Sequence, residues 1–160
     1  MATIDKNQAV IDFLVGCPTI QDNPLFFNFS KEEDNNKSVI TESNDKAVTK
    51  PYIDGSVLRR YTFTIIDYKS VAHNAIIKQA GYSNENVEDI KDLQDIIDWI
   101  NLQADARIFP DFGEDCEMDK MYTTTDNPEF NGVDNVVAPQ LVRYSVTIVI
   151  EYIDNSKRIY

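Results

Sequence analysis

Two hexapeptides, "RYTFTI" at residues 60–65 and "RYSVTI" at residues 143–148, carry the pattern that decides the fold. In the first, Tyr61, Phe63 and Ile65 alternate with polar residues, and the second alternates in the same way and extends the pattern on both sides. Side chains in a strand point to opposite faces with a period of two. Each copy therefore predicts a strand with one buried and one wet face, which favours an antiparallel sheet. Shared strand chemistry explains the likeness, because the sequence shows no duplication outside these residues.

Two amphipathic helices are predicted beside these strands. Residues 4–15 place apolar side chains on one helical face, with Thr3 or Asp5 as a possible cap and a break at Gly16 and Pro18. The clearest helix spans residues 86–106, ends before Pro110 and has this apolar stripe: Val87, Ile90, Leu93, Ile96, Ile97, Ile100 and Ala104.

The remaining segments complete a single α+β domain over residues 1–160. Further strands are expected at 24–29 and 116–124, the strand that contains the second hexapeptide spans 141–153, and 70–82 fits either a helix or a strand. We expect an antiparallel sheet of about four or five strands, with the N-terminal helix and the main helix packed on one face.

A polar excursion at residues 30–55 interrupts this pattern. Short strands are possible at 38–41 and 46–53, and Asn35-Asn36 and Asp54-Gly55 are turn signals. About 25 residues is long for a connection in a compact domain, and such segments are usually functional or disordered. We therefore expect an arm that is mobile in a free subunit and ordered by neighbouring subunits.

Composition limits the classes of function. Fifteen basic and 27 acidic residues give a formal net charge of −12, which opposes binding to nucleic acid or anionic lipid. The N-terminal "MATIDKNQAV" does not resemble a signal peptide, and no apolar run approaches the roughly 18–20 residues that span a bilayer. Cys17 and Cys116 are isolated, which suggests a reducing compartment, although a disulfide between them is possible. We expect a soluble product of the cytoplasm, without membrane contact.

Candidate catalytic and metal-binding groups are sparse. His73 is the only histidine, and no neighbouring motif gives it a catalytic role. The five glycines form no phosphate-binding loop, and no Cys/His spacing indicates zinc. The stretch "DFGEDCEMD" at 111–119 is rich in carboxylates but lacks the ligand spacing of a calcium loop. We expect no enzymatic activity, no cofactor and no metal.

Acidic residues are concentrated in one part of the chain. Between Ser83 and Asp119 there are twelve carboxylates, opposed only by Lys91 and Arg107. A solvated helix face followed by a polar loop explains this charge simply. The other interpretation is an acidic wall that faces a partner to which it must not adhere, with these candidate residues: Asp111, Glu114, Asp115, Glu117 and Asp119.

The order of elements resembles that of phage tail terminators, the tail-completion proteins of tailed phages and phage-tail-like particles, including those of Gram-positive hosts. The stretches that carry the resemblance are "VEDIKDLQDIIDWI" at 87–100, "RIFPDF" at 107–112 and "QLVRYSVTIVIEY" at 140–152. The resemblance covers essentially the whole chain in size and element order. It contains no short motif from which individual binding residues could be transferred.

The resemblance implies a structural virion protein in the neck region of the tail. Such proteins form a ring, usually a hexamer, that caps the tube protein, stops its polymerisation and provides a docking surface for neck or connector proteins. In contractile tails the ring also meets the sheath protein, and DNA passes through it without specific binding. The resemblance thus implies that the acidic wall lines this passage and repels DNA. A closed ring requires a head-to-tail interface, which exposed strand edges or the mixed-polarity sheet face could supply.

Two alternatives remain open at this point. The chain could be another tail or neck component of similar size, such as a connector stopper or a tube subunit. It could also be a small enzyme or ligand-binding domain that uses scattered carboxylates.

Overall fold

Two long antiparallel strands, β4 (Val57–Ser70) and β9 (Leu141–Asp154), form the centre of the molecule. They contain the two similar hexapeptides, and Phe63 of β4 lies opposite Ile148 of β9. The structure is a computed structural model that describes residues 5–21, 25–27, 37–41, 48–70, 77–78, 81–82, 91–133 and 141–159.

Shorter strands extend this pair on both sides into a sheet of seven strands, of which five follow the order β1-β2-β4-β9-β7. Strand β3 pairs with one end of β4, and β8 pairs with β9. The other strands of this sheet are β1 (Leu25–Phe27), β2 (Lys37–Thr41), β3 (Val48–Pro51), β7 (Cys116–Thr123) and β8 (Glu129–Val133). A separate two-stranded sheet consists of β5 (Ile77–Lys78) and β6 (Gly81–Tyr82).

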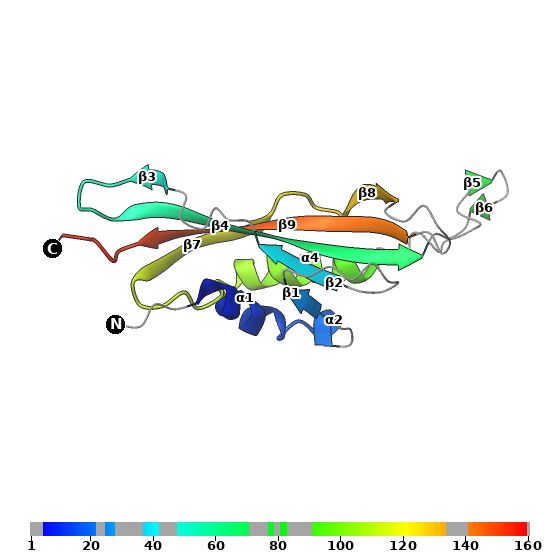
Figure 1. The fold of residues 1–160 in the computed structure, drawn as a ribbon, viewed down its shortest axis with the longest axis horizontal. Coiled ribbons are helices and arrows are strands. Elements are labelled where there is room, and N and C mark those ends of the chain that lie inside the picture. The colour runs from blue at the N-terminus through cyan, green and yellow to red at the C-terminus, as the bar shows by residue number, and fades with distance from the viewer. Residues whose placement is uncertain are drawn as a thin grey trace.

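Three helices lie on one side of the long sheet, as Figure 1 shows: α1 (Lys6–Leu14), α2 (Pro18–Gln21) and α4 (Lys91–Asp105). Asp5 caps α1 through its carboxylate, which accepts hydrogen bonds from the backbone amides of Asn7 and Gln8. The α+β class and the one-sided helical layer agree with the sequence prediction.

The core lies between these helices and the sheet. Buried aliphatic side chains of α4, including Ile96, Ile97 and Ile100, share one cluster with Val146 and Ile148 of β9. Adjacent Ile96 and Ile97 are about 100° apart on a helix, yet both are buried, because α4 also has helical neighbours. On that side the ring of Phe13 lies 4.9 Å from the ring of Trp99.

The opposite face of the sheet is polar and crossed by ion pairs. Arg60 of β4 and Lys120 of β7 both reach Glu151 of β9, at 3.0 and 3.3 Å. The hydroxyl oxygens of Thr64 and Thr147 lie 3.1 Å apart across the central pair. This face therefore has the mixed polarity that the alternating pattern predicted, and its cross-strand pairs help to fix the register.

Several details differ from the sequence prediction. Strand β8 is not among the strands expected from the sequence, and β1 runs parallel to β2 rather than antiparallel. Pro18 begins the short helix α2 instead of only ending α1, because proline suits the first turn of a helix. Residues 86–90 of the helix predicted at 86–106 lie outside the described residues. His73 lies outside them too.

The expected mobile arm at 30–55 needs correction. Residues 37–41 form β2 and residues 48–51 form β3, both paired with β4, and Lys37, Ser38 and Val39 are buried. These segments belong to the sheet of the single subunit. Residues 30–36 and 42–47 lie outside the described part of the chain, where the expectation of an arm stays a prediction.

No helix among the described residues is long and apolar enough to cross a bilayer.

Candidate functional site

All five residues of the predicted acidic wall are exposed, but they open onto different surfaces. Asp111 lines a groove beside α1, whereas Glu117 lines a pocket at the end of the sheet. Glu117 pairs with Ile153 of β9, whose neighbour Tyr152 points into the core, so Glu117 faces the side without helices. The wall as one surface lining a DNA passage stays a prediction.

The groove beside α1 combines carboxylates with aromatic rings. It has a volume of about 460 Å³ and is bounded by α1 and by residues 109–111. We call it the acidic groove and define it by Asp5, Asp12, Phe13, Phe109 and Asp111. The residues that line it include three carboxylates and no lysine or arginine, so an incoming cation would be attracted.

Arg107 fixes one wall of this groove. It has a positive φ of 57°, and it ends α4 with hydrogen bonds from its own amide to Ala104 O and from the Ile108 amide to Gln103 O. This pair of bonds is the Schellman motif, which usually has glycine at the left-handed position. Its guanidinium lies 5.2 Å from the centre of the Phe109 ring and donates to two carbonyl oxygens of β7.

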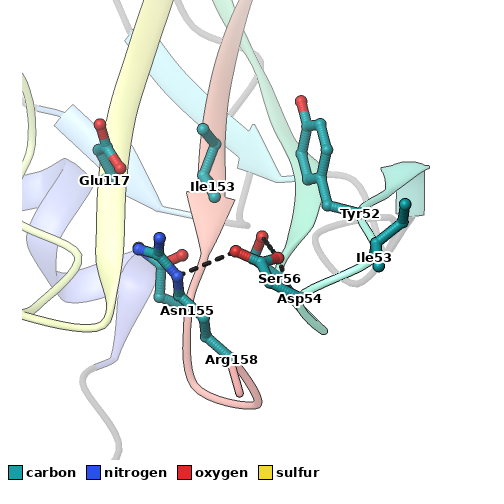
Figure 2. A pocket seen from close by; sticks show the side chains of 8 residues that line it. All are labelled: Tyr52, Ile53, Asp54, Ser56, Glu117, Ile153, Asn155 and Arg158. Atoms are coloured by element: carbon teal, nitrogen blue, oxygen red, sulfur yellow. Dashed lines mark hydrogen bonds and ion pairs between the residues drawn. The ribbon is translucent and has the colours of Figure 1, made fainter. Parts of the chain in front are cut away.

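A second pocket, of about 470 Å³, opens where the β3–β4 hairpin, β7 and the C-terminal segment meet (Figure 2). At its floor the guanidinium of Arg158 lies 2.9 Å from the Asp54 carboxylate. The backbone amide of Ile159 donates a hydrogen bond to Asp54 O. Gly55, at a φ of 88°, lets the chain near Lys157 approach closely, since a Cβ atom there would collide with the Lys157 carbonyl. These contacts hold the C-terminal segment against the hairpin.

Two carboxyls at this end have lowered pKa values. Hydrogen bonds from the side chain and backbone of Ser56, assisted by the nearby Arg158, lower the pKa of Asp54 below its ordinary 3.8. Burial alone would raise the pKa of Asp154, but hydrogen bonds from Ser156 and Arg59 outweigh it and lower that pKa too. Both groups are therefore charged at neutral pH, and they fix the ends of β4 and β9.

At the other end of the sheet, a buried cation joins two strands to α4. The Lys37 ammonium is fully buried, 3.9 Å from the Asp67 carboxylate and 3.4 Å from that of Asp92. Burying a charge is costly unless it is paired, so this contact specifies the docking of β2 and α4. It lies within the folded subunit and offers no open cavity among the described pockets.

The described residues offer few groups that could serve as a nucleophile or as a metal ligand. Cys17 and Cys116 are both free thiols, and burial raises the pKa of Cys116, which makes it less nucleophilic at neutral pH. Among the described residues, no group of three or more metal-ligating side chains comes together. The acidic groove and the second pocket instead display charged groups beside apolar side chains. This arrangement is suited to protein contacts.

Sequence reasoning missed the residues of the hairpin and the C-terminal segment. The turn signal at Asp54-Gly55 located the hairpin, but it gave no reason to expect Arg158 beside it. That contact joins residues 104 positions apart. A detectable signal was the apolar pair Tyr52-Ile53 directly before the Asp54-Gly55 turn, in an otherwise polar segment.

Comparison with known proteins assigns no family: no protein-family model matches the chain, and no curated protein is significantly similar to it.

Proposed function

We propose that this protein is a structural subunit of a phage-type tail, a tail terminator that forms a ring on the end of the tail tube. The ring stops further addition of tube protein and offers its outer face to neck or connector proteins. In a contractile tail it also contacts the sheath. The ring is most simply a hexamer.

The order of elements around two central strands carries this proposal. An N-terminal helix, short strands in a charged segment, a long strand, an acidic helix and a final long strand follow one another along the chain. This order supports the resemblance that the sequence suggested.

The one-sided architecture supports assembly rather than catalysis. Helices cover one face of the sheet, while the other face carries cross-strand ion pairs. The two most exposed of the large apolar side chains, Ile53 and Ile159, lie on the hairpin and the C-terminal segment.

The acidic segment at 111–119 is consistent with a channel for DNA. Its five carboxylates are exposed, and like charge prevents adhesion of the phosphate backbone. In the ring that we propose, the four carboxylates within 114–119 face the lumen and let DNA pass, whereas Asp111 lies in the acidic groove beside α1. Another tail or neck component of similar size, a connector stopper or a tube subunit, would use many of the same features.

A binding experiment with tube protein tests the proposal. The purified protein is mixed with separately assembled tubes and examined by mass photometry and negative-stain electron microscopy. We expect ring-shaped caps at tube ends and an arrest of tube growth. A connector stopper would bind an existing cap instead of bare tube ends, and a tube subunit would lengthen the tubes. A protein that stays monomeric and never binds tube ends would contradict the proposal.

A further inference from the structure

One end of the molecule presents apolar side chains that contribute nothing to the core. Ile53, at the turn between β3 and β4, has a relative exposure of 106%, and Ile159 of the C-terminal segment has one of 75%. Tyr52 is also exposed, and the Lys50 ammonium lies 5.4 Å from the centre of its ring. Figure 1 places this hairpin and the C-terminal segment together at one end of the long sheet.

The two segments that carry these side chains are basic, although the whole chain is strongly acidic and Glu117 lines the adjoining pocket. We call it the tip and define it by Lys50, Tyr52, Ile53, Lys157 and Ile159. The side chains of residues 50–55 and 156–159 include three basic groups and one acidic group, a net charge of +2. Exposed apolar side chains flanked by basic groups, here Lys50 and Lys157, are suited to dock an acidic partner.

The tip is also preorganised. The ion pair of Arg158 with Asp54 and the hydrogen bond from Ile159 to Asp54 join its two segments. Ser56 donates to the same carboxylate from its backbone amide and from its hydroxyl, at 3.0 and 2.5 Å. A surface that is already ordered loses less conformational entropy when it binds.

The acidic groove of the same chain has the complementary properties. It is concave, it carries three carboxylates, and Phe13 and Phe109 provide apolar surface between them. Local hydrogen bonds orient its carboxylates: Asp12 accepts from Gln8 at 2.8 Å, and Asp111 accepts from the Gly113 amide at 2.9 Å. The tip and the acidic groove belong to different elements, so one copy can donate the tip while it accepts the tip of another.

We propose that the tip of one subunit docks into the acidic groove of the next, with Ile53 against the aromatic rings and the lysines against the carboxylates. This inference rests on the proposed ring and identifies the two surfaces that close it. Such a contact is heterologous and propagates from copy to copy until a ring closes. The partner is a second copy of this chain, because both halves of the complementary pair lie on one subunit.

Charge reversal with mixing tests this contact directly. The tip variant is Lys50→Glu with Lys157→Glu, and the groove variant is Asp12→Lys with Asp111→Lys. Each variant alone presents like charges across the contact, so we expect its assembly to weaken about tenfold or more. An equimolar mixture restores both contacts, since each reversed tip meets a reversed groove and each natural tip meets a natural groove. Mass photometry, with and without tube ends, measures the oligomers.

Control variants carry charge changes of the same sign elsewhere. Asp98→Lys with Asp126→Lys alters exposed carboxylates outside the acidic groove, and Lys91→Glu alters an exposed lysine on α4. We expect these variants to assemble almost normally. Circular dichroism and thermal unfolding establish that every variant is folded.

A neutral substitution separates the apolar contribution from charge. Ile53→Ser removes a fully exposed side chain, so we expect unchanged thermal stability and weakened assembly. Leu102→Ser, at an exposed position on α4, is its control and should change neither thermal stability nor assembly.

If the natural protein forms rings but the charge-reversed variants also assemble alone, the tip–groove contact is wrong and the ring proposal stands. If the natural protein forms no ring even on tube ends, the ring proposal and the tip–groove contact are both wrong.

Discussion

Truncation of Ile97 on α4 tests how the main helix packs. Ile97 has no exposed surface and belongs to the core cluster with Val146 and Ile148. Ile97→Ala removes three carbon atoms, and at about 0.8 kcal/mol per buried methylene the loss of transfer free energy is about 2.4 kcal/mol. Incomplete relaxation around the cavity adds to this loss, so the expected destabilisation falls within about 2–5 kcal/mol.

Urea denaturation followed by circular dichroism measures this change. With a slope of about 2 kcal/mol per molar urea, the transition midpoint should fall by about 1–2.5 M. Leu102→Ala on the same helix is the control, because Leu102 is 63% exposed and its truncation should cost about 0.5 kcal/mol or less. An unchanged midpoint for Ile97→Ala, or equal losses for both variants, would show that the assigned buried face of α4 is wrong.

Three further perturbations test the charges of the fold and of the proposed channel. Lys37→Met leaves the buried Asp67 without this cation and should cost about 3–5 kcal/mol by urea denaturation, whereas adding Asp67→Leu should recover much of the loss. Because the pKa values of Asp54 and Asp154 are lowered, their stabilisation is present above the ordinary 3.8 and disappears as pH falls through the lowered values. Thermal unfolding between pH 6 and pH 3 should therefore depend less on pH after substitution of both by Asn, and an identical profile would contradict this assignment. Neutralising the four acidic residues within 114–119 should leave thermal stability nearly unchanged but impair genome ejection, most strongly at low ionic strength. Normal tails that eject equally at every salt concentration would favour a merely solvated loop.

The sequence predicted the centre of this fold well because local patterns specify it. Period-two alternation identifies β4 and β9, and the apolar stripe of α4 identifies the face that packs on them. The same reasoning missed β8, which follows a polar loop and contains Asn131 and Gly132, residues of low strand propensity. Pairing with the long β9 supplies the stabilisation that its own sequence lacks.

The candidate surfaces were harder to predict, since they depend on contacts between distant segments. The acidic segment was visible as composition, but composition did not show that Asp111 and Glu117 open onto different surfaces. The buried Lys37 was equally hidden, because a lysine in a polar segment normally indicates solvent exposure. Its burial follows from the pairing of β2 with β4, which places it opposite Asp67.

Arg107 makes the outer edge of β7 less accessible for pairing with another subunit. Strand β7 pairs with β9 on one side, and its outer edge would ordinarily offer a template for another strand. A bulge between Met118 and Lys120 disrupts that edge, and the Arg107 guanidinium occupies the carbonyl oxygens of Met118 and Asp119. Arg107 adopts a left-handed backbone conformation that glycine would adopt at lower cost. Its side chain supplies the two hydrogen bonds to β7 that glycine could not make. A strand that added to this edge would have to displace the Arg107 guanidinium from these two carbonyl oxygens. A contact between preformed surfaces, such as the tip and the acidic groove, avoids that cost and leaves the wall of the groove intact.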